Sequence, residues 1–68
     1  MDFAEAFKKL KEGHRVRRRR WEASVYLYVQ DGRLRYRVWD SFFGDWFSEE
    51  TRICNHDLMA NDWEIYND

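Results

Sequence analysis

The sequence contains no proline, only three glycines and a single cysteine, Cys54. One cysteine excludes an internal disulfide framework and a zinc site built on several cysteines. This usage suits a reducing compartment such as the cytosol. No apolar run approaches the roughly 20 residues of a membrane span, and the acidic start of the chain does not resemble a signal peptide. We therefore expect no membrane partner, and the sequence shows no linker, repeat or low-complexity segment.

The chain is short, and its 68 residues are enough for one domain, over residues 1–68. A domain of this size buries only about 60% of the surface of its unfolded chain. Aromatic residues nevertheless make up 19% of the sequence, which is more than one small core can hold. Some rings are therefore expected at a ligand site or a subunit interface. We predict a homo-oligomer, either a dimer or a tetramer.

Charge is distributed unevenly along the chain. Residues 1–37 contain eleven Lys and Arg and five Asp and Glu, a net charge of +6, whereas residues 38–68 contain one Arg and eight Asp and Glu, a net charge of −7. The two halves can pair within the fold or across a dimer, because opposite charges on neighbouring strands attract. The alternative is a basic face and an acidic face with different partners. We favour pairing.

The pattern of apolar residues predicts an α+β fold. Residues 2–12 should form a helix that Asp2 caps and Gly13 ends, because apolar residues recur there at helical spacing. Short strands are predicted over residues 14–20, 24–30, 33–39, 46–53 and 63–66. One or two helical turns are expected over residues 55–61, with Leu58 and Met59 inward. The architecture is an N-terminal helix packed on a small, mainly antiparallel β-sheet with a central hairpin and a short C-terminal helical turn.

The central hairpin has a defined register. Asp31-Gly32 predicts a two-residue turn, because both positions need a positive φ. This turn pairs Gln30 with Arg33, Val29 with Leu34, Leu27 with Tyr36, and Val25 with Val38. The apolar residues then meet on one face, so the turn and the strand pattern agree. The other face presents Tyr26 and Tyr28 beside Arg35 and Arg37.

Two groups of residues have the chemistry to bind a phosphate-bearing ligand. Residues 17–20 are four arginines followed by Trp21; guanidinium groups bind phosphate bidentately, and an indole stacks on a base or a cation. The same arginines can instead pair with the acidic half of the chain, and both interpretations stay open. The face carrying Tyr26 and Tyr28 also offers rings and cations, with a subunit interface as its alternative.

The sequence supports no catalytic assignment. Cys54, His56 and Asp57 lie close together in sequence, but a nucleophile and its base are recognised by geometry. His14 and His56 lack a metal-ligand spacing, and no glycine-rich phosphate loop is present. The slightly acidic chain also differs from the high pI of nucleic-acid-binding domains. We predict a protein that is not an enzyme and has neither metal nor cofactor.

Both ends of the chain resemble a known family. The segments "DFAEAFKKLKEGHRVRRRRW" and "DLMANDWEIY" are similar, in this order, to the opening and closing motifs of the second phage Thoeris anti-defence family. The resemblance implies an α+β fold assembled as a homotetramer. It also implies binding of cyclic ADP-ribose-type signals or cyclic dinucleotides without cleavage. A few members of the family are anti-CRISPR proteins.

The resemblance also implies roles for individual residues. Arg18 and Trp21 would lie near the ligand, Trp46 would replace a family tryptophan, and Asp57, Asp62 and Trp63 would contribute to binding or to structure. The sequence departs from the family where Glu22-Ala23 replace Asn-Gly, and its middle segment is shortened to "FGDWFSEE".

These observations predict a protein of the host bacterial cytoplasm that sequesters a cyclic nucleotide immune signal. The alternative is an inhibitor that binds a bacterial defence protein, such as a Cas effector, through its acidic half or its exposed rings; a small structural phage protein is a third possibility. The predicted ligand-binding residues are Arg18, Trp21, Tyr26, Tyr28, Arg35, Arg37, Trp46, Asp57, Asp62 and Trp63.

Overall fold

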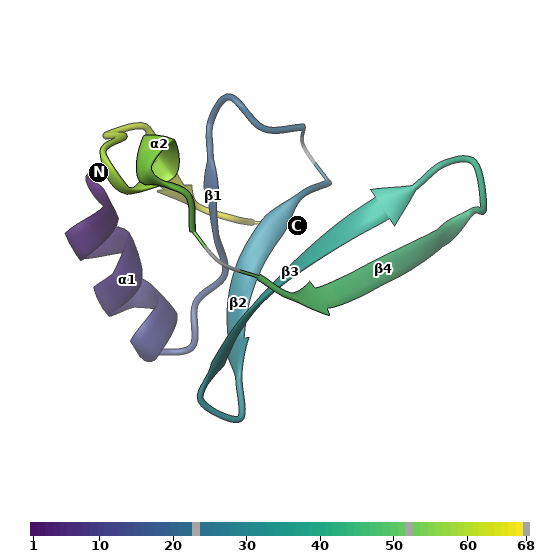
Figure 1. Ribbon diagram of the computed structural model, residues 1–68, viewed down its shortest axis with the longest axis horizontal. Coiled ribbons are helices and arrows are strands. Elements are labelled where there is room, and N and C mark those ends of the chain that lie inside the picture. Colours follow the sequence, from purple (N-terminus) through teal and green to yellow (C-terminus); the bar gives the residue numbers. More distant parts are fainter. Residues whose placement is uncertain (23, 52, 68) are drawn as a thin grey trace.

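The computed structural model describes residues 1–22, 24–51 and 53–67. Ala23, which departs from the family pattern, and Arg52, in the predicted strand 46–53, lie outside the described residues. The elements in chain order are α1 (Phe3–Lys11), β1 (Val16–Arg18), β2 (Tyr26–Gln30), β3 (Arg33–Asp40), β4 (Asp45–Glu50), α2 (Asn55–Leu58) and β5 (Trp63–Ile65). The strands form one antiparallel sheet in the order β4-β3-β2-β1-β5 (Figure 1). The α+β prediction is confirmed.

Helix α1 begins and ends where its capping residues predict. The Asp2 carboxylate accepts a hydrogen bond of 2.9 Å from the Glu5 backbone N–H, which satisfies one of the first free donors of the helix. Gly13 follows the helix with a φ of +98°, a left-handed conformation that glycine adopts without steric cost. Ala6 and Leu10 are buried, so the helix covers one face of the sheet.

The predicted register of the central hairpin is confirmed. Gln30 pairs with Arg33, and Leu27 pairs with Tyr36. The prediction is wrong at Val25, because strand β2 begins only at Tyr26. The Val25 backbone N–H instead donates to the Glu22 carbonyl over 3.0 Å, so the chain is still in a turn at that residue.

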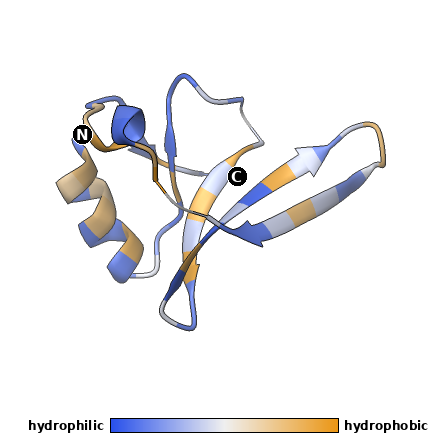
Figure 2. Ribbon diagram, in the orientation of Figure 1, coloured by the Kyte–Doolittle hydropathy of each residue, from blue (hydrophilic) through white to orange (hydrophobic). Residues whose placement is uncertain are grey.

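Strands β3 and β4 form a second hairpin, which projects away from α1 (Figure 1). Its strands are longer than predicted toward the turn, because Asp40 pairs with Asp45 and leaves a tight connection through Gly44, whose φ is +67°. Figure 2 shows apolar residues at this turn, far from the apolar residues of α1. The distal part of this hairpin therefore contributes little to the core.

The core lies between α1 and strands β1, β2 and β5. Its buried residues are Ala6, Leu10, Val16, Leu27 and Trp63, with Phe3, Trp21, Leu34, Tyr36, Ile53 and Ala60 packed against them. The expectation that Leu58 and Met59 point inward is wrong, because both are exposed. Helix α2 is a single turn, and the neighbouring Ile53 and Ala60 fill the inward positions. None of the helices in the described parts of the chain is long and apolar enough to cross a membrane.

Candidate functional site

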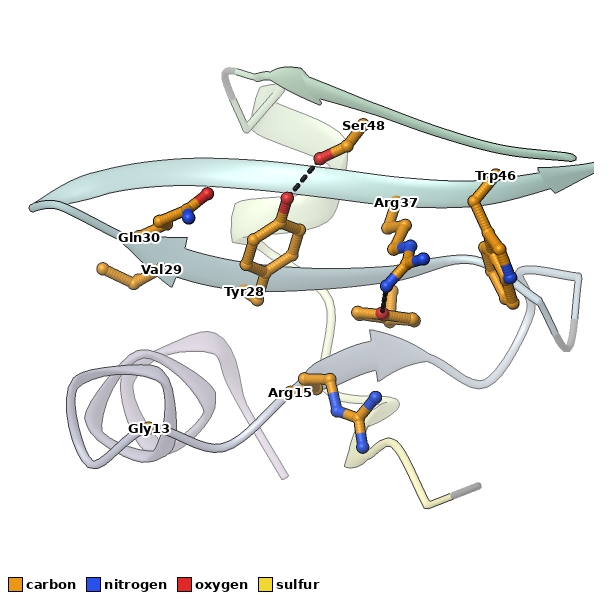
Figure 3. A pocket seen from close by; sticks show the side chains of 9 residues that line it. Gly13, Arg15, Tyr28, Val29, Gln30, Arg37, Trp46 and Ser48 are labelled. Carbon is orange, nitrogen blue, oxygen red and sulfur yellow. Dashed lines mark hydrogen bonds between the residues drawn. The ribbon is translucent and has the colours of Figure 1, made fainter.

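The face of the sheet opposite α1 contains a pocket. Side chains alternate along a strand, and Leu27 packs into the core, so Tyr26 and Tyr28 point to the opposite face. There they border a cavity of about 560 Å³, which lies within the range of small-molecule sites, about 300–1,000 Å³. The lining residues are Gly13, Arg15, Tyr26, Tyr28, Val29, Gln30, Arg37, Trp46 and Ser48 (Figure 3).

Two arginines of this pocket lie against aromatic rings. The Arg37 Cζ is 4.6 Å from the centroid of the Trp46 ring, and the Arg15 Cζ is 5.1 Å from the Tyr26 ring and 5.3 Å from the Tyr66 ring. The Tyr26 and Tyr66 rings stack with their centroids 4.4 Å apart. A cation over an aromatic face is stabilised by the negative face of the ring. The rings therefore hold both guanidinium groups in defined positions.

Arg37 has no acidic partner among residues 1–22, 24–51 and 53–67. Among the residues that the structure describes, no carboxylate lies within salt-bridge distance of Arg37, whereas Arg33 on the same strand pairs with Glu50 over 3.2 Å. The described residues that line the pocket include no Asp or Glu at all. Arg37 therefore gives the pocket a positive charge that none of the described lining residues neutralises.

Tyr28 and its neighbours add to the positive character of this face. The Tyr28 hydroxyl is hydrogen-bonded to the Ser48 hydroxyl, and the Arg35 Nε donates to the Tyr28 Oη over 3.3 Å. The bond with Ser48, followed by the bond with Arg35 and the charges of Arg35 and Arg37, lowers the pKa of Tyr28, although burial acts in the opposite direction. The hydroxyl is therefore more acidic than that of a free tyrosine.

A second cluster forms around Arg18, on the core side of the sheet. Arg18 is only 7% exposed. Its Nη1 lies 2.7 Å from the Asp57 carboxylate, and its Nε lies 2.7 Å from the Asp62 carboxylate. The hydrogen bond from Arg18 lowers the pKa of Asp62. Burial raises the pKa of Asp57, but hydrogen bonds from Arg18 and Cys54 outweigh it, and the net pKa is below the ordinary value. Arg18 is thus a cation whose charge is matched inside the fold.

The acidic half of the chain pairs with the basic half. Glu64 lies 3.6 Å from Arg17 and 3.7 Å from Arg19, in addition to the two ion pairs of Arg18. This confirms the favoured interpretation of the charge asymmetry. Three of the four arginines of residues 17–20 therefore lie against carboxylates of the C-terminal half.

The sequence matches the family model described as the Thoeris anti-defense 2-like domain, or Tad2-like domain, over residues 1–66. The chain belongs to the Tad2-like family. This confirms the resemblance of its two end motifs and associates the chain with phage counter-defence against Thoeris. No curated protein and no solved structure gives a significant match.

The structure of this Tad2-like chain divides the ten predicted site residues into two groups. Tyr26, Tyr28, Arg37 and Trp46 line the pocket, and Arg35 lies beside it. The other group surrounds the core on the opposite face and consists of Arg18, Trp21, Asp57, Asp62 and Trp63. The structure therefore does not bring the ten predicted residues together at one site.

Five lining residues of the pocket in this Tad2-like domain were not among the predicted site residues: Gly13, Arg15, Val29, Gln30 and Ser48. Tyr66, whose ring stacks on Tyr26 beside the pocket, was also missed. Ser48 is two residues from Trp46 on the same strand, so alternation could have found it. Arg15 and Tyr66 could not be found in this way, because their positions depend on the pairing of β1 with β2 and β5.

Cys54 and Asp57, two of the residues with side chains that could act in catalysis, are both bonded to other side chains of the fold. The Cys54 Sγ donates to the Asp57 Oδ2 over 3.1 Å, and the Asp57 Oδ1 is bound to Arg18. Across residues 1–22, 24–51 and 53–67, no group of three or more His, Cys, Asp and Glu side chains is arranged to hold a metal.

Proposed function

We propose that this Tad2-like domain binds a cyclic nucleotide immune signal, of the cyclic ADP-ribose type or a cyclic dinucleotide, in the pocket around Arg37. It holds the signal without cleaving it, in the cytoplasm of the host bacterium. The observation that carries this proposal is Arg37 itself, a cation stacked on Trp46 and without a carboxylate partner among the described residues. The family membership supports a role in counter-defence.

The chemistry of the pocket suits a nucleotide. A guanidinium that stacks on a ring through its flat face keeps its N–H edge available, and this edge binds phosphate oxygens bidentately. Aromatic rings beside it can stack on a base. Apart from Tyr26 and Tyr28, the described lining residues include none of the side chains that commonly act as general bases in hydrolysis, such as a carboxylate, a histidine or a thiol. Binding without turnover is therefore the activity that this pocket favours.

The replacement Arg37→Gln tests this site. We expect the Kd for the bound signal to rise by about 10- to 100-fold, because hydrogen bonds to charged groups contribute about 1.5–3 kcal/mol. The measurement is calorimetric titration of the purified full chain with a panel of cyclic ADP-ribose isomers and cyclic dinucleotides. Recovery of the ligand intact after denaturation shows that it was not hydrolysed.

Arg33→Gln is the matched control, because it makes the same change on the same strand outside the pocket. The Kd of Arg33→Gln for the signal should stay within about twofold of that of the unchanged protein, because the variant loses only an exposed ion pair. Absence of binding for the whole panel would reject the proposed function. Equal losses in the two variants would reject the pocket as the site.

We also propose that the chain assembles into a dimer or a tetramer through the turn of the second hairpin. Phe42 is 88% exposed and Phe43 is 69% exposed, and these rings lie 5.1 Å apart, with Phe47 beside Phe43. Contiguous exposed rings mark interaction surfaces. Direct binding of a bacterial defence protein, the alternative function, stays a prediction. Such a partner would compete with a second copy of the chain for the same rings.

Replacing Phe42 and Phe43 together with serine should shift the protein toward the monomer, because it removes most of the exposed aromatic surface of the turn. Light scattering coupled to size-exclusion chromatography measures the mass. Met59→Ser is the control, since Met59 is 85% exposed but lies outside this cluster. An assembly that survives the double replacement would contradict this interface.

A further inference from the structure

Tyr26 contacts both arginines of the pocket. It lies on the central strand β2, and its side chain is fixed in place, because only 4% of the residue is exposed. The face of its ring lies under Arg15, with 5.1 Å from the Arg15 Cζ to the ring centroid. Its hydroxyl oxygen accepts a hydrogen bond of 3.4 Å from the Arg37 Nη1. One buried side chain therefore connects two cations that come from different parts of the sequence.

Each of the two cations has a second aromatic contact that limits its rotation. Arg15 also lies over the Tyr66 ring, and Arg37 lies over the Trp46 ring. The Arg37 Nη1 donates to the Tyr26 hydroxyl, and Figure 3 shows Arg15, which directly precedes β1, below Arg37. Stacked guanidinium groups bind anions through their edges. Two such groups anchored on one ring suit an anion that carries more than one charge.

We propose that Tyr26 is a positioning residue, which places Arg15 and Arg37 to form a subsite for a pyrophosphate-type anion. Tyr26 acts here through the two arginines and not by touching the anion. The inference deepens the proposed function and rests on it for the identity of the natural ligand. The subsite itself can be tested with inorganic pyrophosphate alone.

The experiment is an NMR titration of the ¹⁵N-labelled full chain with sodium pyrophosphate, followed at the Trp46 indole N–H. Sodium chloride at equal ionic strength is the reference. We expect a saturable shift with a Kd of about 1 mM or lower. Arg37→Gln should weaken binding by about tenfold, and Tyr26→Phe, which keeps the ring and removes the hydroxyl, by about fivefold.

The double variant, Tyr26→Phe with Arg37→Gln, separates positioning from a general structural effect. If the hydroxyl acts by holding Arg37, its loss has no further effect once Arg37 is gone, so the double variant should bind as Arg37→Gln does. Tyr26→Phe combined with Arg33→Gln is the control pair, and there the effects should multiply. If Tyr26→Phe does not fold, Arg15→Gln replaces it, and about tenfold weaker pyrophosphate binding is expected.

Three results would overturn the inference. The first is a shift of the Trp46 indole signal with pyrophosphate that is no larger than the shift with chloride. The others are a double variant in which the losses of affinity from Tyr26→Phe and Arg37→Gln multiply, and an Arg15→Gln variant that binds pyrophosphate as tightly as the unchanged protein. Pyrophosphate binding without binding of any cyclic nucleotide would support the subsite and reject the proposed function. Nucleotide binding with a pyrophosphate shift no larger than that of chloride would reject the subsite alone. The two failures are therefore distinguishable.

Discussion

Replacing Arg18 with alanine should lower the melting temperature by roughly 15 °C or more, because the change leaves two carboxylates without their shared partner. Asp57 and Asp62 each lie 2.7 Å from the Arg18 guanidinium. These two ion pairs connect β1 to α2, which contains Asp57, and to Asp62 just before β5, both far away in sequence. Loss of one partner of a buried ion pair is among the largest effects of a single substitution. Circular dichroism during heating measures it.

Arg19→Ala is the matched control for Arg18→Ala. Arg19 is a neighbour in sequence, but it is exposed and lies 3.7 Å from Glu64, so its loss should change the melting temperature by no more than a few degrees. Equal effects in the two variants would show that the Arg18 cluster contributes no more than a surface ion pair does.

The pH dependence of unfolding gives a second measurement of the stability that the Arg18 cluster contributes. The pKa values of Asp57 and Asp62 are lowered in the folded protein, so their contribution to stability is present above the unfolded value of about 3.9. It is lost as the pH falls below that value, through the lowered folded-state pKa values. Urea unfolding of the unchanged protein should therefore require much less urea at pH 3 than at pH 5. Arg18→Ala should reduce this difference, since it removes the cause of the lowered pKa values.

The helix and the central hairpin could be predicted because their information is local. Asp2, Glu5 and Gly13 define the ends of α1 within a few residues of one another, and Asp31-Gly32 sets the register of β2 and β3 without help from the rest of the chain. The errors fall where local rules do not decide. Val25 satisfies the alternation of a strand but uses its N–H in a turn, and Met59 fits a helical stripe on a helix that is too short to bury it.

The candidate site was predictable only in part, for a physical reason. The register of the central hairpin places Tyr26, Tyr28, Arg35 and Arg37 on one face, and the structure keeps them there. Consecutive arginines give no such information, because their direction depends on which strands lie beside β1. The pairing of Arg18 with Trp63 directs Arg18 toward the core side, and Arg15, which no motif distinguished, reaches the pocket.

The division between a scaffold and a pocket bears on Trp63, for which the family resemblance implies a contribution either to ligand binding or to structure. Trp63 is 2% exposed, and it packs edge-on against Trp21 with centroids 5.3 Å apart. Its indole N–H donates to the Asp57 carbonyl over 3.0 Å. Its role in this arrangement is to join the core to the Arg18 cluster.

Trp63→Ala should reduce the free energy of unfolding by about 3–5 kcal/mol, the usual cost of removing a large buried aromatic side chain. A chain of this length has a total stability of only about 3–10 kcal/mol, so the variant should be largely unfolded near body temperature. Urea denaturation followed by circular dichroism measures the loss. Trp39→Ala is the control, because Trp39 is a half-exposed ring of the second hairpin, and its removal should cost roughly 1 kcal/mol or less.

Trp63→Phe decides whether Trp63 is scaffold or ligand contact. Phenylalanine keeps most of the buried ring and loses the hydrogen bond to Asp57, so the variant should fold with reduced stability, and its affinity for the nucleotide should be unchanged at a temperature where it is folded. A fall in affinity of tenfold or more in that folded variant would move the ligand from the Arg37 pocket to the face of Trp21 and Trp63. Unchanged affinity, together with the loss in Arg37→Gln, would assign binding to the open face of the sheet and stability to the core side.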